Sequence, residues 1–232
     1  MEFLESYLRE ARKGLYGLIL AAPLFLIYEL SVIIADLRVR NGADAIISRS
    51  LSRLPFLDPN YFKIIIIIII FGVLFLRTDD RRLRMAFIPL IFAESIIYSI
   101  FLGTVVNKIL EPLVNFPFLF SRSQLPANAI TAVGAGLYEE FLFRFLLFGF
   151  LFWAGKKIFS DKVIPGILAG IVASILFSAY HYLGSLAPPF ELYSFLYRMV
   201  GGMVLTAIYY YRGFAIAAYT HAFYDLWIIG IF

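Results

Sequence analysis

Long runs of apolar side chains follow one another along almost the whole sequence, with only short polar connections between them. A transmembrane helix needs about 20 consecutive, mostly apolar residues, and several of these runs reach that length. The segment 63–76, KIIIIIIIFGVLFL, is almost pure hydrocarbon, and 62% of the 232 residues are hydrophobic, whereas ordinary globular domains are nearer to half. The sequence therefore predicts an integral, multi-pass membrane protein, located in the cell membrane.

Seven runs are candidate membrane spans, and they predict an all-α, polytopic transmembrane helical bundle of about seven or eight spans. The candidates are residues 15–36, 62–76, 85–109, 127–154, 163–184, 192–211 and 214–232. An eighth span within 110–126 is an alternative, although its prolines and its length favour a loop or a re-entrant segment. Residues 42–57 are too polar to span, and the helical spacing of their apolar residues favours an amphipathic helix at the membrane interface. We expect residues 1–232 to form a single membrane domain.

Charge and cysteine content exclude several classes of function. The net charge of +4 is interpreted as Lys and Arg flanking the membrane spans rather than as a nucleic-acid surface. The chain contains no cysteine, which excludes disulfides, a cysteine nucleophile and a thiolate metal site. The expected partners are therefore the lipid bilayer and a membrane peptide or protein, with no nucleic acid.

The segment 136–148, GLYEEFLFRFLLF, places Glu139, Glu140 and Arg144 within a run of Leu and Phe. Successive residues of a helix turn by about 100°, so the two glutamates point to different faces. Glu140 and Arg144 are four residues apart, which puts them on one face and predicts an ion pair that stabilises helix packing. Glu139 is left without a partner on its own helix.

The two histidines of the chain also lie in or beside apolar runs. His181 ends the fifth run and His221 lies within the seventh, with Asp225 four residues later on the same face. A charged group in hydrocarbon costs about 2.5–3.5 kcal/mol on insertion scales, so scattered groups of this kind would be costly. Each alone has a structural explanation, such as packing for a histidine. Together with Glu139 they predict one intramembrane polar cavity lined by different helices.

A glutamate, two histidines and an aspartate suit hydrolysis by an activated water molecule. A buried carboxylate beside a neutral imidazole can accept a proton from water, and the second histidine can donate a hydrogen bond to a developing oxyanion. Glu139, His181, His221 and Asp225 could instead hold a divalent metal such as zinc, although the HExxH motif is absent. No cofactor is required by the sequence, and both mechanisms stay open. Either one predicts hydrolysis of a polar bond, most simply a peptide bond, inside the membrane.

Three motifs follow in order along the chain: Glu139-Glu140-x-x-x-Arg144, Phe177-x-x-x-His181 and His221-x-x-x-Asp225. Their order, spacing and placement at the ends of apolar runs resemble the CPBP family, which contains the CAAX prenyl endopeptidases and the bacteriocin-processing (Abi) intramembrane proteases. The resemblance implies a helical membrane fold with a cavity open to one leaflet and to one aqueous side. The motifs lie within residues 136–225, and the first 125 or so residues resemble the family only in being hydrophobic.

The resemblance also implies a role for each motif residue. Glu139 and His181 would activate water, and His221 with residue 225 would stabilise the oxyanion. Residue 225 departs from the asparagine that the family more often carries, because an ionised aspartate cannot donate a hydrogen bond. Asp225 is therefore protonated, orients His221 or coordinates a metal. The supporting residues Glu140, Arg144 and Phe177 would hold the motifs in place.

The leading hypothesis is an intramembrane endopeptidase, either a glutamate protease or a metalloprotease. Its substrate would be a membrane-associated peptide, for example a prenylated, leader or sorting-signal peptide. The main alternative is a non-enzymatic bacteriocin-immunity or partner-binding membrane protein that keeps the polar cluster for packing. A proton-coupled transporter is a further alternative, although the sequence contains no inverted repeat. Glu29, Asp36 and Glu94 also lie in or near apolar runs. We interpret each as a cap, an interfacial group or an interhelical hydrogen-bonding group, and Glu94 is also a candidate for lining the cavity.

Overall fold

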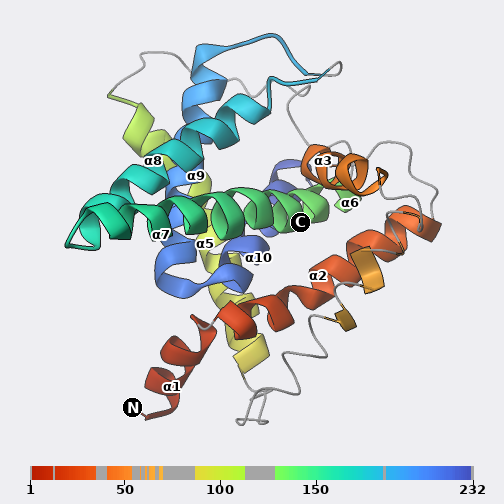
Figure 1. The fold of residues 1–232 in the computed structure, drawn as a ribbon, viewed down its shortest axis with the longest axis horizontal. Helices are drawn as coiled ribbons and strands as arrows, with labels where there is room; N and C mark the ends of the chain where they lie inside the picture. Colours follow the sequence, from red (N-terminus) through yellow and green to blue (C-terminus); the bar gives the residue numbers. More distant parts are fainter. Residues whose placement is uncertain are drawn as a thin grey trace.

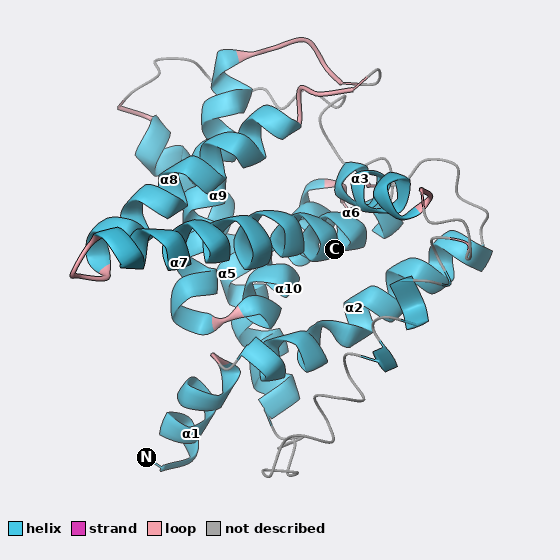
Figure 2. Cartoon of the chain, viewed as in Figure 1, coloured by secondary structure: helices cyan, strands magenta, loops and turns pink. Residues whose placement is uncertain are grey.

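In the computed structural model, the described part of the chain consists of helices joined by loops and turns (Figure 2). The structure describes residues 2–12, 14–34, 41–53, 58, 61, 63–65, 68–69, 87–112, 129–184 and 187–230. Its helices are α1 (Glu2–Ala11), α2 (Gly14–Ile34), α3 (Gly42–Leu51), α5 (Phe87–Leu110), α6 (Ala129–Gly134), η2 (Ala135–Glu139), η3 (Phe141–Phe148), α7 (Gly149–Ile158), α8 (Val163–Tyr180), α9 (Leu192–Arg212) and α10 (Phe214–Ile228). These ranges contain no strand, which confirms the all-α prediction for this part of the chain.

Three of the described helices, α5, α8 and α9, are long and apolar enough to cross a membrane. They coincide with the predicted spans 85–109, 163–184 and 192–211. On α5, Ile97, Ile100 and Phe101 are each more than half exposed. Lipid chains solvate such side chains without cost, so the outward surface of α5 is that of an integral membrane protein.

The other predicted spans differ from the observed helices. The predicted span 15–36 corresponds to α2, which has 21 residues and includes Pro23. The predicted span 214–232 is only the 15-residue helix α10. Most of 62–76 and nearly all of 110–126 lie outside the described residues, as do residues 54–57 of the predicted amphipathic helix, whose first part is α3.

Helix α10 forms the centre of the structure rather than a lipid-facing span. Every residue from Phe214 to Ala222 is buried, and α10 packs against α5, α2, η2 and α9. It begins directly after Gly213, whose φ of 97° lies in the region that glycine adopts readily. A side chain at Gly213 would also collide with the backbone of Ala11, so this tight turn is tied to the end of α1.

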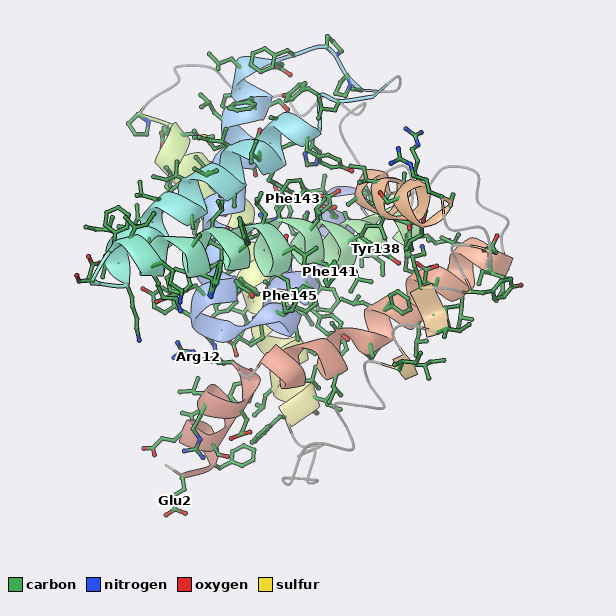
Figure 3. The ribbon with its side chains drawn as sticks, in the orientation of Figure 1. Glu2, Arg12, Tyr138, Phe141, Phe143 and Phe145 are labelled. Carbon is green, nitrogen blue, oxygen red and sulfur yellow. The ribbon has the colours of Figure 1, made fainter. Side chains whose placement is uncertain are left out.

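The predicted span 127–154 is a continuous helical rod from residue 129 to residue 158, which crosses the middle of the view in Figure 1. The prediction of a regular α-helix is wrong at its centre, because η2 and η3 are wider π-helical turns. Such turns are rare and are frequently found at functional sites. In Figure 3, Phe143 lies on one side of the rod and Phe141 and Phe145 lie on the other. These aromatic side chains therefore pack against different neighbours of the rod.

A cluster of charged residues joins α1, α5 and α9 away from the predicted motifs. Arg212 on α9 contacts Glu94 on α5 at 2.5 Å (Nε to Oε1) and 2.7 Å (Nη2 to Oε2). The Tyr7 hydroxyl on α1 donates a hydrogen bond to the same carboxylate. Glu94 is therefore the interhelical hydrogen-bonding group that the sequence suggested. Among the described contacts its partners are Arg212, Tyr7 and Tyr98 rather than the motif residues.

Candidate active site

Two of the motif residues, from different helices, face each other at a narrow separation. Glu139 ends η2 and His181 follows the last residue of α8. Oε2 of Glu139 lies 3.7 Å from Nε2 of His181. This distance exceeds that of a direct hydrogen bond and is short enough for one water molecule to contact both atoms. Glu139 is only 4% exposed, whereas 24% of the His181 side chain is exposed.

The tautomer of His181 follows from its second ring nitrogen. Nδ1 lies 2.9 Å from the backbone carbonyl oxygen of Phe177, and a carbonyl can only accept a hydrogen bond. In a neutral ring the proton is therefore on Nδ1, and Nε2 is an acceptor that faces Glu139. Oε2 of Glu139 has no hydrogen-bond partner within the described ranges. The pair thus presents two acceptor atoms to a common point.

His221 lies between two carboxylates. Its Nδ1 is 2.7 Å from Oε1 of Glu140, and its Nε2 is 3.8 Å from Oδ2 of Asp225, one turn later on α10. The same oxygen of Glu140 is 2.8 Å from Nη1 of Arg144, which is the ion pair expected from their spacing. Glu140 therefore connects its own helix to His221, a contact that sequence spacing did not indicate.

The ring of Phe177 connects the three motifs. Its centroid is 4.9 Å from that of His181 and 6.0 Å from that of His221. On another side, the Arg144 guanidinium lies 4.3 Å from the Phe177 ring centroid and donates a 3.2 Å hydrogen bond from Nη2 to the carbonyl of Gly202. A buried guanidinium over an aromatic face is a favourable contact. Phe177 thus contacts both histidines and Arg144, and Arg144 joins this group to α9 through Gly202.

The approach of η2 to α10 depends on a residue without a side chain. An added Cβ at Gly136 would lie 2.6 Å from the carbonyl oxygen of Ala218 and 2.6 Å from the backbone nitrogen of Ala222. Ala218 and Ala222 flank His221 in the sequence, and Gly136 precedes Glu139 by one turn. Only glycine allows the two backbones to come this close, which brings the glutamates near His221.

Two further residues reach the site. Asn41 donates a 2.8 Å hydrogen bond from Nδ2 to Oε1 of Glu139. Arg198 on α9 donates from Nη1 to Ser194 Oγ at 2.7 Å, and it is near enough for its charge to act on both His181 and Asp225. The Asn-Gly at 41–42 signals a helix start in the sequence, but nothing in it indicates contact with Glu139.

The fit to a metal ion was a question left open by the sequence. Among the residues that the structure describes, no group of three or more His, Asp or Glu side chains is arranged to hold a metal. His221 Nδ1 faces Glu140 and His181 Nδ1 faces a carbonyl, so each ring has one nitrogen left for a ligand. Glu139 faces His181 and Asp225 faces His221, so these four side chains form two pairs. The mechanism proposed below therefore uses no metal.

Comparison with protein families gives one match. A family model described as type II CAAX prenyl endopeptidase Rce1-like matches residues 121–227, a range that includes all three motifs. Comparison of the chain with curated proteins and with solved structures finds no match. The described helices of spanning length agree with a membrane protease. Residues 121–227, somewhat less than half of the chain, are therefore similar to the CAAX prenyl endopeptidases, in agreement with the resemblance that the order of the motifs suggested.

Proposed function

We propose that the protein is an intramembrane endopeptidase in which a water molecule held between Glu139 and His181 attacks a peptide bond. The observation that carries this proposal is the 3.7 Å separation of Glu139 Oε2 and His181 Nε2. Both atoms accept hydrogen bonds, so a water molecule can donate one proton to each. Its lone pairs then point away from the two side chains, toward the space where a carbonyl carbon would lie.

In the attack step the water oxygen forms a bond to the carbonyl carbon, and Glu139 takes one of the water protons. His181 holds the other O–H bond and thereby fixes the direction of attack. The carbonyl oxygen becomes an oxyanion. When the C–N bond breaks, Glu139 returns its proton to the leaving nitrogen, as expected for a general base that later acts as an acid. The products are a carboxylic acid and an amine, and Glu139 is again ionised.

His221 is proposed to stabilise the oxyanion. With Nδ1 donating to Glu140, the ring can also donate from Nε2 only if it carries both protons and a positive charge. Glu140 at 2.7 Å and Asp225 at 3.8 Å supply negative charge on both sides of the ring, which favours that state. Asp225 therefore acts through His221 in this proposal and need not donate a hydrogen bond itself. This accounts for an aspartate at a position where the family more often has asparagine.

The substrate class proposed is a membrane-associated peptide that reaches Glu139 past His181. His181 is the more exposed member of the water-binding pair, and the matched family is named for prenyl endopeptidases. Prenylated peptides are therefore the first substrates to test, followed by leader and sorting-signal peptides. All three classes combine a lipid-anchored or apolar segment with a scissile bond near the membrane surface.

The test is cleavage of these peptides by the purified protein in liposomes. We expect Glu139→Gln to reduce turnover at least 100-fold, since it removes the base while keeping size and shape. The matched control is Glu111→Gln, at the end of α5 and outside the site, which should leave turnover unchanged. Wild-type turnover by Glu139→Gln would reject the proposal. No cleavage by the wild type, combined with lower stability of Glu139→Gln, would support the non-enzymatic alternative.

A further inference from the structure

Glu139 is held by a residue outside the segment that the family model matches. The side-chain amide of Asn41 donates a hydrogen bond of 2.8 Å from Nδ2 to Oε1 of Glu139, across 98 positions of the sequence. Asn41 and Glu139 are 9% and 4% exposed. Because water cannot readily replace a hydrogen bond at such a buried position, this contact restrains the carboxylate.

The orientation of the Asn41 amide is set by its place at the start of α3. Its Oδ1 accepts a 2.9 Å hydrogen bond from the backbone N–H of Ala43, the usual contact of an asparagine N-cap. With the amide oxygen engaged there, the NH₂ group faces Glu139. Both ends of the amide therefore have the partner that their chemistry requires, and the assignment of nitrogen and oxygen is fixed.

A buried network of hydrogen bonds and ion pairs restrains the backbone of Asn41. The backbone N–H of Asn41 donates to the Tyr28 hydroxyl at 3.2 Å, and this hydroxyl donates to Asp44 Oδ2 at 2.9 Å. Nζ of Lys63 lies 2.5 Å from Asp44 Oδ1 and 2.7 Å from Glu29 Oε1. Lys63 is 5% exposed, and the Glu29 and Asp44 side chains are fully buried. Buried ion pairs with several hydrogen bonds resist rearrangement, because leaving any member unpaired is costly.

The same network also contacts the residue next to Glu139, the second member of the hydrogen bond. Tyr138, the neighbour of Glu139 in the sequence, donates a hydrogen bond to Glu29, and Nζ of Lys63 lies 5.2 Å from the Tyr138 ring centroid. A Cβ at Gly42 would overlap the Tyr180 hydroxyl, so α3 begins directly against the residue before His181. The start of α3 is thus seated between α2, η2 and the end of α8.

We propose that Asn41 is a positioning residue for the Glu139 carboxylate, supplied by the N-terminal part of the chain. By occupying Oε1 it fixes the rotation of the carboxylate and leaves Oε2 directed at His181. A neutral amide does this without offsetting the negative charge of the carboxylate. A lysine or arginine at the same position would offset that charge. The inference rests on the proposed function in assigning Glu139 as the base. It implies that residues 121–227 alone do not contain the complete site.

Two substitutions separate this role from the capping role of the same side chain. Asn41→Ser keeps an N-cap, because serine caps helices about as well as asparagine, but its hydroxyl is too short to reach Glu139. Asn41→Asp also keeps a cap, lacks the N–H donor and adds a negative charge beside Glu139. The matched control is Asn107→Ser on α5, where the exposed Oδ1 of Asn107 accepts a hydrogen bond from Tyr193, and neither residue belongs to a motif.

For Asn41→Ser we expect kcat to fall about 10- to 100-fold, the range that small misplacement of a reacting group produces. KM should stay within about two-fold, because substrate contacts are unchanged. The apparent Tm should match that of the Asn107→Ser control, and Asn41→Asp should lose at least as much kcat as Asn41→Ser. A kcat of Asn41→Ser within about two-fold of wild type would overturn the inference, as would a loss of activity explained fully by a lower Tm.

An infrared readout distinguishes failure of this inference from failure of the proposed function. The difference spectrum between wild type and Glu139→Gln isolates the carboxylate band of Glu139. Loss of the donor in Asn41→Ser should shift that band, whether or not the protein cleaves any peptide, because hydrogen bonding alters the carboxylate stretch. An unshifted band overturns the inference. A shifted band in a protein that cleaves none of the three peptide classes supports the Asn41 contact and rejects the peptidase.

Discussion

A methyl group added at Gly136 should push η2 away from α10 and separate the glutamates from His221. The added carbon would lie 2.6 Å from the Ala218 carbonyl oxygen and from the Ala222 backbone nitrogen. These are backbone atoms of a buried helix, so no side-chain rotation relieves the contact. Ordinary contact begins at 3.4 Å, and the two helices must therefore move apart by about 0.8 Å.

Two effects should follow from that movement. Overpacking of a well-packed interior costs about 1–3 kcal/mol, part of which is offset by the higher helix propensity of alanine, about 1 kcal/mol. A displacement approaching 1 Å at a reacting group costs about 100-fold in rate. We therefore expect Gly136→Ala to lower peptide cleavage by about 10- to 100-fold and to lower the free energy of unfolding by at most about 2 kcal/mol.

The assay compares Gly136→Ala with Gly149→Ala on the same helical rod. A Cβ at Gly149 would meet only the Arg144 carbonyl oxygen at 3.8 Å, an ordinary contact. This control should keep wild-type cleavage and gain stability from its higher helix propensity. Cleavage in liposomes and thermal unfolding in detergent measure the two effects. If Gly136→Ala behaves like Gly149→Ala in both assays, the close approach of η2 and α10 does not set the geometry of the site.

Three other changes have defined outcomes. Arg144→Met should lower the free energy of unfolding by about 3–5 kcal/mol, because it removes one partner of a buried ion pair and leaves Glu140 with His221 alone. Denaturant unfolding measures this, and a loss below about 1 kcal/mol would contradict it. Asp225→Asn should keep cleavage within about ten-fold of wild type, because an amide can donate a hydrogen bond to the oxyanion directly. If Asp225→Asn instead loses as much cleavage as Asp225→Leu, the negative charge of Asp225 is itself needed. Removal of metals with a chelator should leave cleavage unchanged. If the chelator abolishes cleavage, zinc restores it and elemental analysis finds bound zinc, the protein is a metalloprotease instead.

Local spacing was enough to predict the parts of the structure that depend on neighbouring residues. The pair Glu140–Arg144 follows from a separation of one helical turn, and it is present at 2.8 Å. Helices α5, α8 and α9 follow from the lengths of their apolar runs. The expectation that an unpaired glutamate meets a histidine from another helix rested on the cost of isolated charge in lipid. Glu139 and His181 are found facing each other.

The central position of α10 could not be read from its composition. Hydropathy counts apolar side chains but does not distinguish those that face lipid from those that face other helices. In α10 the alanines at 215, 217, 218 and 222 are completely or almost completely buried. Their small size allows close approach of helices, and this was the one signal in the sequence that separated α10 from an ordinary span. The wide turns of η2 and η3 were not predicted, because a rotation of about 100° per residue holds only for a regular α-helix.

The contact of Asn41 with Glu139 lies beyond any local pattern. It joins residues 98 positions apart, and its existence depends on how α3 is seated against α2 and η2. A capping asparagine is a common residue with a sufficient local explanation. Nothing in a single sequence separates a cap that also binds a carboxylate from one that does not. Contacts of this kind are set by tertiary packing, and only coordinates reveal them.

The brevity of α10 has a consequence for how the protein is made. A 15-residue helix is about 22 Å long, whereas the hydrocarbon layer is about 30 Å thick. It is poorly suited to remain in a bilayer alone while the ribosome releases it. Contacts with α2, α5, η2 and α9 hold α10 in place, and all four of these helices are synthesised before it. The site around His221 is therefore complete only after α10 has been synthesised and has packed against these four helices.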